Sequence, residues 1–298
     1  MPVATRRLVG RRQPRQEQHA TLKHILEPIE ADLKRVTHRV LARLQDSVAR
    51  KAIYLITAGG KQLRPALVLL AGRSGDALRR QGALLDLAVA VELIHTATLI
   101  HDDLIDHAAL RRRQPTFHER FGTERAVLMG DYLYSVAFTL LSDLEDSYVT
   151  QVMSRVCQRL SRGEFFEVDR RFDIGLTEGE YLEIIRDKTA SLIAACCQLG
   201  AHVAGARPET VERLREFGLN FGMAFQIMDD CLDLIGEEQV VGKTLRSDLD
   251  KGSLSLPVIY LATSLSTSAR EALFAPLRQG TPDRRLLSRI ATAAQESG

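Results

Sequence analysis

The strongest constraint on the fold of this chain is the helical spacing of its apolar residues. They recur every three to four positions, the period that places them on one face of an α-helix, over residues 22–45, 66–70, 84–104, 125–144, 148–166, 178–199 and 208–234. The sequence lacks alternating runs of β-branched residues and Asn-Gly turns, the usual signals of strands and hairpins. The pattern therefore predicts an all-α protein, a large single-domain bundle of ten or more helices.

Local signals mark where this domain and some of its helices begin. Thr177 followed by Glu180 matches a capping box and predicts that a helix begins after Thr177. The first 17 residues hold five arginines and little apolar content. We expect residues 1–19 to form a basic disordered tail and residues 20–298 to form the domain. A targeting peptide, or a tether to an anionic surface, is the alternative for the tail.

Composition excludes several classes of protein. Lys and Arg number 40 against 38 for Asp and Glu, a net charge of +2, which argues against binding to nucleic acid through bulk charge. No stretch of 18 uninterrupted apolar residues predicts a membrane span. The four cysteines form no C-x-x-C pair, so we expect free buried thiols in a cytoplasmic protein instead of disulfides or a zinc site.

Two acidic clusters of the form D-D-x-x-D interrupt apolar helical stretches. The first holds Asp102, Asp103 and Asp106, and the second holds Asp229, Asp230 and Asp233. Like charges one helical turn apart repel each other, so such a cluster is costly unless a cation neutralises it. An exposed helix face explains one such motif well, but two copies inside apolar stretches favour a metal-binding function. Carboxylate oxygens are ligands for Mg²⁺, which also binds substrate phosphates, so the motifs predict two helices that hold Mg²⁺ and a diphosphate between them.

Basic residues near these motifs supply candidate phosphate contacts. Lys61 and Arg64 follow a Gly-Gly turn where a helix begins, a place that favours anions. Arginines at 111–113 follow the first acidic motif, and their planar guanidinium groups suit phosphate oxygens. Lys188 lies in an apolar stretch, and Lys243 lies in a loop after the second motif. Each of them taken singly is more simply an exposed surface charge.

Taken together, these motifs resemble those of the trans-type isoprenyl diphosphate synthases. The matching segments run in order from about residue 20 to 265: GGKQLRP, IHTATLIHDDLID with its trailing arginines, DKTASL, FGMAFQIMDDCLD, and then GK and DLDKG. The resemblance implies the isoprenoid synthase type I fold, with helices around a central apolar tunnel, and usually a homodimer. It also implies Mg²⁺-dependent, head-to-tail condensation of isopentenyl diphosphate with an allylic diphosphate, for which we expect farnesyl or geranylgeranyl diphosphate.

The resemblance also assigns a role to individual residues. It implies that the six aspartates hold two or three Mg²⁺ ions, which bridge them to the diphosphate of the allylic substrate. Catalysis is assigned to Asp102, Asp103, Asp106, Asp229, Asp230 and Lys188. The isopentenyl diphosphate site is assigned to Lys61, Arg64, His95 and Arg112. Contacts to the allylic diphosphate are assigned to Arg111, Lys188, Thr189, Gln226 and Lys243.

The chain departs from the family pattern at three places. Arg113 stands where the family has Gly, and Ser253 stands where it has Lys, with Lys251 two residues earlier as a possible substitute. The sequence also stops earlier than relatives usually do. The alternative that these departures raise is weakened activity, or a non-catalytic subunit of a heteromeric synthase. A terpene cyclase of the same fold is disfavoured, because the second aspartate motif and GGKQLRP are both intact.

Two small residues lie about one turn before the first aspartate motif. Short-chain relatives carry a Phe or Tyr there, which closes the floor of the tunnel, whereas this chain has Ala97 and Thr98. We therefore expect a medium-to-long product, of octaprenyl-like length. The alternative is that these residues pack against a neighbouring helix and that the product is short, such as geranylgeranyl or farnesyl diphosphate.

Overall fold

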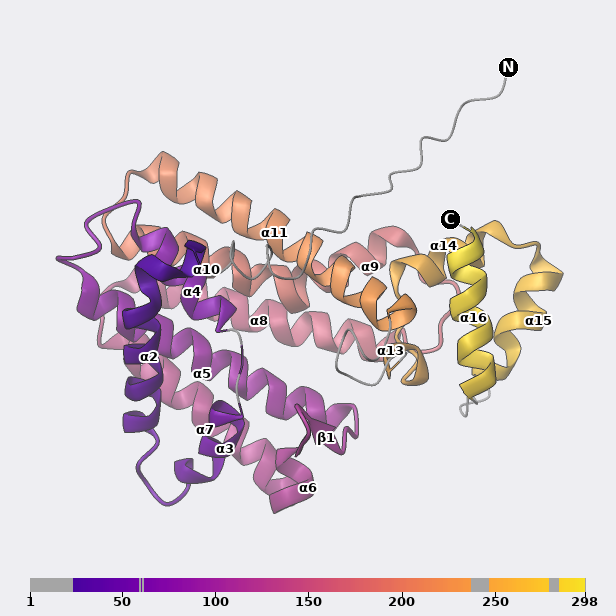
Figure 1. Ribbon diagram of the computed structural model, residues 1–298, viewed down its shortest axis with the longest axis horizontal. Coiled ribbons are helices and arrows are strands. Elements are labelled where there is room, and N and C mark those ends of the chain that lie inside the picture. Colours follow the sequence, from indigo (N-terminus) through magenta and orange to yellow (C-terminus); the bar gives the residue numbers. More distant parts are fainter. Residues whose placement is uncertain (1–23, 59, 61, 237–246, 279–283, 298) are drawn as a thin grey trace.

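The computed structural model describes residues 24–58, 60, 62–236, 247–278 and 284–297, and almost every element in these ranges is a helix (Figure 1). The first half contains η1 (Glu27–Ile29), α2 (Glu30–Arg43), η2 (Ala49–Ala52), α3 (Ile53–Thr57), α4 (Leu63–Gly72), α5 (Gln81–Ile105), β1 (Leu110–Arg111), β2 (Gln114–Pro115), α6 (Phe117–Phe121) and α7 (Thr123–Ser142). The second half contains α8 (Ser147–Asp169), α9 (Glu178–Ile185), η3 (Arg186–Ala190), α10 (Ser191–Val203), α11 (Pro208–Ile235), α13 (Ser247–Asp250), α14 (Leu256–Ser264), α15 (Thr267–Arg278) and α16 (Arg284–Ser297). The all-helical prediction is confirmed.

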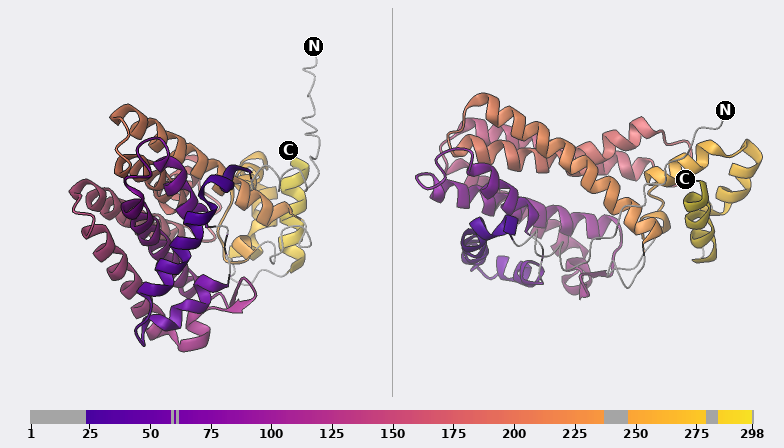
Figure 2. Two further views of the ribbon diagram at one scale, coloured as in Figure 1. Left: turned by 60° about the vertical axis from the view of Figure 1, so that its left-hand side comes forward. Right: turned by 45° about the horizontal axis from the view of Figure 1, so that its top comes forward.

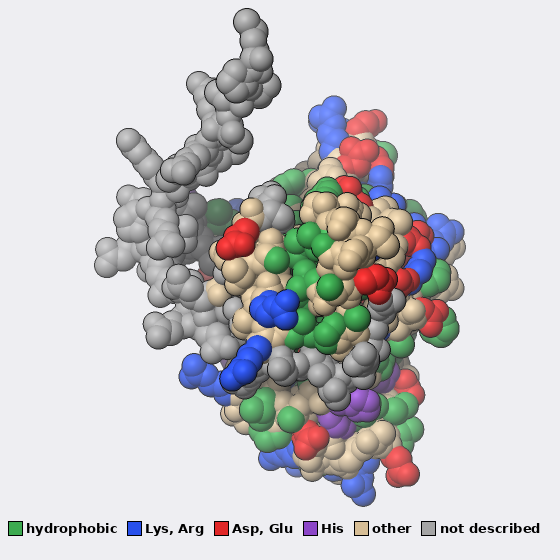
Figure 3. Space-filling view, turned by 90° about the vertical axis from the view of Figure 1, so that its right-hand side faces the viewer, with side chains coloured by type: hydrophobic (Ala, Val, Ile, Leu, Met, Phe, Trp, Pro, Cys, Tyr) green, Lys and Arg blue, Asp and Glu red, His purple; other side chains and the backbone are tan. Residues whose placement is uncertain are grey.

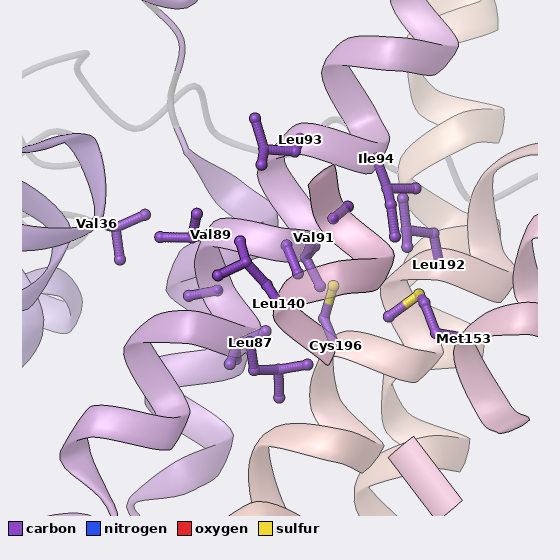
Figure 4. Packing of buried hydrophobic residues seen from close by; sticks show 14 of the residues in the cluster. Val36, Leu87, Val89, Val91, Leu93, Ile94, Leu140, Met153, Leu192 and Cys196 are labelled. Atoms are coloured by element: carbon purple, nitrogen blue, oxygen red, sulfur yellow. The ribbon is translucent and has the colours of Figure 1, made fainter. Parts of the chain in front are cut away.

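Helix α5 is the centre of the larger hydrophobic core. It packs against α2, α4, α7 and α10, which explains why it is apolar on almost every side. By length and composition α5 could cross a membrane, but 67% of its most apolar window is buried within the protein. Val89 of α5 faces Val36 of α2, and on the other side Ile94 lies near Leu192 and Met153 (Figure 4). The burial of α5 by its neighbours places its last turn, with the first aspartate motif, at the border of this core.

A second hydrophobic core lies toward the C-terminus. It is formed by α9, the end of α11 and α13 to α16, and α14 to α16 make one end of the molecule (Figures 1 and 2). Hydrophobic side chains are visible among charged ones on that end (Figure 3). Leu160 belongs to the first core and Tyr181 to the second, and both line one large cavity. The candidate site therefore lies where the two cores meet.

The structure confirms the predicted capping box and divides one predicted helix. The Thr177 hydroxyl accepts a hydrogen bond from the Glu180 backbone N–H, and the Glu180 carboxylate accepts one from the Thr177 backbone N–H. The stretch predicted as one helix over 178–199 is α9 and α10 joined by η3, a turn of π-helix. A π-turn widens the helix locally and is frequent at functional sites. The spacing of apolar residues does not reveal this π-turn, because the turn adds only one residue to the helical repeat.

A short β-hairpin, with two residues in each strand, follows α5. The sequence analysis did not predict it. Leu110 pairs with Pro115 and Arg111 with Gln114, which leaves Arg112 and Arg113 as the turn. Both have positive φ, 50° and 64°, as a type I′ turn requires. Asn and Gly usually occupy such a turn, so its sequence signal was missing here. The backbone strain of this turn falls on two arginines.

The strain leads to a prediction for Arg113, the residue that stands where the family has Gly. The side chain of Arg113 is exposed, and left-handed backbone costs an L-residue roughly 1–2 kcal/mol. We expect Arg113→Gly to increase the free energy of unfolding by about 1 kcal/mol. Calorimetry should therefore show a melting temperature that is higher by a few degrees. The same change at Arg79, an exposed residue whose φ is not in the positive range, serves as the control and should not stabilise the protein. A lower melting temperature for Arg113→Gly would contradict the strain argument.

Three predicted features lie outside the described residues. The basic tail at 1–19 is one of them, and Lys61 and Lys243 are the others. The remaining candidate site residues are all described.

Candidate active site

The two aspartate motifs open onto the same cavity, which has a volume of about 1270 Å³. Asp102, Asp103 and Asp106 reach it from the end of α5, and Asp229 and Asp230 reach it from α11. In the first motif the spacing of one helical turn places Asp102 and Asp106 on one side of the helix. Five of the six predicted aspartates therefore border one space, although they come from distant parts of the chain.

The sixth aspartate has a different position. Asp233 is only 2% exposed and is not among the residues that line the cavity. One of its carboxylate oxygens accepts a hydrogen bond from the Asp248 backbone N–H over 3.3 Å. This contact ties α11 to the start of α13, so Asp233 supports the site from behind its wall.

In this structure the carboxylates of the first motif are paired with basic side chains. Arg111 donates from Nε to both oxygens of Asp103, over 2.8 and 2.9 Å. Arg171 donates to Asp106 Oδ1 over 2.6 Å, and Lys251 donates to Asp106 Oδ2 over 3.0 Å. Burial raises the pKa of Asp103, and the Arg111 guanidinium opposes that shift. The arginine predicted to contact the allylic diphosphate is thus already directed toward the cavity by an aspartate.

Lys188 occupies the middle of the π-turn η3 and points toward carboxylates of α8. Its Nζ lies 2.7 Å from Glu164 Oε2 and also contacts the Glu167 carboxylate. Burial lowers the pKa of Lys188, but Glu167, Asp102 and Glu164 together outweigh burial and raise it above its ordinary value. Lys188 therefore carries a full positive charge next to the first aspartate motif.

Close packing of α8 against η3 fixes the position of Lys188. A Cβ atom at Gly163 would lie 2.6 Å from the Lys188 backbone nitrogen and 3.1 Å from Asp187 Cβ. Only glycine allows this approach, because any side chain would push the backbones apart. Arg162 Nε donates to the buried Asp187 carboxylate over 2.6 Å and joins the same two elements. Two neighbouring residues of α8 therefore hold the π-turn in place.

Asp230 of the second motif is held by one polar side chain of its own helix and one of a neighbouring helix. The Tyr181 hydroxyl donates to Asp230 Oδ2 over 2.6 Å, and Gln226 Nε2 donates to Asp230 Oδ1 over 2.7 Å. Thr189 donates in turn to Gln226 Oε1 over 2.7 Å. Burial raises the pKa of Asp230 to about 6, although the Tyr181 and Gln226 hydrogen bonds favour the charged form. Thr189 and Gln226, both predicted substrate contacts, line the cavity beside this motif.

A smaller cavity of about 340 Å³ adjoins the first one. It contains His95, Arg111, Arg112 and Glu92, and the Arg64 guanidinium lies 2.9 Å from His95 Nε2. Burial lowers the pKa of His95 well below its ordinary value, and Arg64 lowers it further. His95 is therefore neutral, and its Nε2 accepts a hydrogen bond from Arg64. The predicted contacts for isopentenyl diphosphate that the structure describes lie in or beside this smaller cavity.

The donor set at the larger cavity fits Mg²⁺. Burial raises the pKa of Asp102 to about 7, and the Glu164 and Asp106 carboxylates add to this shift against the opposing Lys188 charge. A divalent cation would favour the ionised carboxylate, and Mg²⁺ prefers oxygen ligands. Among the described side chains, no three His, Cys, Asp or Glu residues already form a metal site. Mg²⁺ commonly takes one or two carboxylates and completes its shell with water and phosphate oxygens.

Comparison with known proteins places this site in a family. The family model for polyprenyl synthetase matches residues 45–293. The chain belongs to the polyprenyl synthetase family. It is a prenyltransferase, because the members of that family are isoprenyl diphosphate synthases.

Named relatives and solved structures agree with that assignment. The chain is 40% identical to heptaprenyl diphosphate synthase component 2 of Geobacillus stearothermophilus, over 84% of this chain and 77% of that protein. It is 43% identical to the geranylgeranyl diphosphate synthase of Methanosarcina mazei, over 69% of this chain and 64% of that protein. A crystal structure of polyprenyl synthase from Caulobacter crescentus CB15, complexed with calcium and isoprenyl diphosphate, superposes with a TM-score of 0.85. It is 35% identical and covers 92% of this chain and 84% of that one.

The two predicted chain-length residues of this synthetase have different surroundings. Thr98 lines the larger cavity, on the same face of α5 as His101 and Asp102. Ala97 is 0% exposed, belongs to the first hydrophobic core and is not among the residues that line either cavity. Thr98 is therefore in contact with the space that would receive a growing chain, and Ala97 is one position off that face.

Sequence reasoning missed four residues that take part in the site. Glu164 and Glu167 contact Lys188, Tyr181 contacts Asp230, and Arg171 contacts Asp106. The segment RGEFFE, residues 162–167, did carry a signal, because a glycine and two glutamates lie close together on a helix there. The partners of these residues could not be read from the sequence, since they come from separate helices.

Proposed function

We propose that this chain is a polyprenyl diphosphate synthase that joins isopentenyl diphosphate to an allylic diphosphate, head to tail, with Mg²⁺. The observation that carries the proposal is the meeting of five motif aspartates at one cavity, with Lys188 and Arg111 beside them. Such a site can bind a diphosphate through cations and through carboxylate-bound metal at the same time. The adjoining cavity, lined by His95 and Arg112 and with Arg64 in contact with His95, would supply a second anion site for isopentenyl diphosphate.

The chain's own residues suit ionisation of the allylic substrate. When bound, Mg²⁺ would withdraw negative charge from the leaving diphosphate. Lys188 and Arg111 add fixed positive charge at the same place, so the allylic C–O bond breaks and the diphosphate departs. The double bond of the isopentenyl unit then forms the new C–C bond, and the proton it loses goes to the departed diphosphate. Apolar wall residues, among them Leu160 and Ile184, exclude water from the cation.

We propose a medium-to-long all-trans product. Thr98 supports this, because a small side chain on the cavity wall leaves room beyond the first motif. The heptaprenyl relative agrees with it, whereas the geranylgeranyl relative supports the short-chain alternative.

We expect Thr98→Phe to shorten the product by at least one isoprene unit, because its ring would stand in the path of the growing chain. Ala97→Phe should destabilise the protein instead, by about 1–3 kcal/mol, because it overpacks a full core. Product length is read by chromatography of the hydrolysed alcohols, with Thr98→Val as the control of similar size. If Thr98→Phe makes the same product as the wild type, Thr98 does not limit the chain.

We further propose that the protein acts in the cytoplasm as a homodimer. Its four cysteines are free thiols, as expected for a reducing compartment. Exposed apolar side chains on α7, Leu128 at 65% and Val127 at 42%, suit a protein interface. A heteromer with a second subunit is the alternative, because the Geobacillus relative is named as component 2.

Two measurements test these proposals. Purified protein is incubated with isopentenyl diphosphate, farnesyl diphosphate and Mg²⁺, and the product is identified. The mass of the protein in solution is measured separately by light scattering. A linear polyprenyl diphosphate from a dimer is the expected result. A cyclic hydrocarbon would indicate a terpene cyclase, and an inactive protein would indicate the non-catalytic subunit.

A further inference from the structure

The carboxylate of Asp106 is held from two sides by basic residues that no motif assigns to it. Arg171, just past the end of α8, binds Oδ1, and Lys251, from the segment after α13, binds Oδ2. Lys251 and Asp106 both line the large cavity, whereas Arg171 is not among the residues that line it. The arginine therefore holds the carboxylate from behind, and the lysine covers the oxygen beside the cavity.

The two basic residues are fixed to each other through their neighbours in the chain. The Phe172 backbone N–H donates to the Gly252 carbonyl over 2.8 Å. A Cβ atom at Gly252 would lie 2.7 Å from the Phe172 ring, so this contact requires glycine. Phe172 has φ of 60° and Gly252 has φ of 86°, and a bulky residue in the left-handed region is a true outlier. Strain of this kind persists where the surrounding structure enforces it, often at functional sites.

Lys251 places a positive charge at the same cavity that Ser253 lines. Ser253 lines the same cavity but carries no charge. Lys251 stands two residues earlier and, through the Phe172–Gly252 contact, is directed to Asp106. The ammonium group thus lies where a cation bound to Asp106 Oδ2 would lie.

We propose that Lys251 is an exchangeable cation for the first aspartate motif. Without metal it neutralises Asp106, and when Mg²⁺ and a diphosphate bind, its ammonium group moves from Asp106 to a diphosphate oxygen. Arg171 is a positioning residue that keeps Asp106 oriented during the exchange. The inference rests on the proposed function, because it requires a diphosphate in this cavity.

The exchange predicts two opposite effects for Lys251→Met. Metal alone should bind more tightly, by roughly three- to tenfold, because the ammonium group no longer competes for Asp106. Inorganic pyrophosphate in the presence of Mg²⁺ should bind more weakly, by roughly ten- to a hundredfold, because one charge-assisted hydrogen bond is lost. A residue with a merely structural role would shift both affinities in the same direction. Lys251→Arg keeps the charge and should restore most of the pyrophosphate affinity.

The experiment measures the two affinities on full-length protein. Mn²⁺ alone is titrated by electron paramagnetic resonance, and pyrophosphate with Mg²⁺ is titrated by calorimetry. Lys34→Met, which removes an exposed ion pair with Glu30 on α2, serves as the matched control and should change neither affinity. Melting temperatures of all variants confirm that they are folded.

Opposite shifts for Lys251→Met, with recovery in Lys251→Arg, support the exchange. Shifts in the same direction, or no change in either affinity, overturn it while the proposed function stands. A wild-type protein that does not bind pyrophosphate with Mg²⁺ overturns the proposed function and the exchange together.

Discussion

Replacing Asp102 by Asn should stabilise the metal-free protein at pH 8 and remove nearly all synthase activity. Burial, together with the Glu164 and Asp106 carboxylates, raises the pKa of Asp102 from 3.8 to about 7 in the folded protein. The folded state therefore binds this proton more tightly than the unfolded state, and stability falls as pH rises from about 4 to 7. Because Asn does not titrate, the variant does not lose this stability as pH rises. We expect a gain of up to about 4 kcal/mol at pH 8 and roughly a 10³-fold loss in kcat.

The pH dependence separates this electrostatic cause from better packing. Melting temperatures of wild type and Asp102→Asn, measured without metal at pH 5 and pH 8, should differ more at pH 8. At pH 5 the wild-type carboxyl group is protonated, so the gain should nearly disappear. Asp86→Asn on the same helix serves as the control, because Asp86 forms a half-exposed ion pair with Arg39. A variant of Asp102 that is less stable than wild type at pH 8 would contradict this explanation.

Replacing Gly163 by Ala should reduce turnover by roughly a hundredfold. The added Cβ would lie 2.6 Å from the Lys188 backbone nitrogen, so α8 and the π-turn η3 must separate. A displacement of about 1 Å at a catalytic group can cost about a hundredfold in rate. We expect a stability loss of only about 1–3 kcal/mol from the overpacking, and hence a folded but slow enzyme.

Steady-state kinetics at saturating substrates measure that effect. Gly179→Ala is the matched control, because a Cβ atom there meets nothing within 4 Å. It should leave kcat unchanged and stabilise α9 slightly, since Ala favours the helix. Normal turnover of a folded Gly163→Ala protein would show that the close contact with η3 does not position Lys188.

The sequence was most informative where candidate site residues lie close together on one helix. Asp102 and Asp106 are one turn apart, so helical spacing alone directs both to one side. Asp233 is likewise one turn from Asp229, yet it does not line the cavity, and it accepts a hydrogen bond from Asp248 in a later helix. Likewise, Arg171 and Lys251 meet Asp106 only through the fold. Their pairing depends on long-range packing, which local periodicity does not contain.

Irregular backbone conformation was the other feature that could not be predicted from the sequence. The turn at Arg112 and Arg113 has no glycine or asparagine, so its hairpin carries no ordinary signal. The π-turn that carries Lys188 lies inside a regular apolar repeat. In both places, irregular backbone delivers a basic residue to one of the two cavities. Local rules of helix formation are therefore broken where the proposed chemistry needs positive charge.

The most direct test is a crystal structure grown with Mn²⁺ and inorganic pyrophosphate, with the metal located by its anomalous scattering. We expect manganese ions between the carboxylates of Asp102 and Asp106, at the end of α5, and that of Asp229 on α11, with pyrophosphate bridging the two helices. Manganese bound at only one of the two motifs, or pyrophosphate outside the large cavity, would contradict the claim that both motifs act on a single diphosphate.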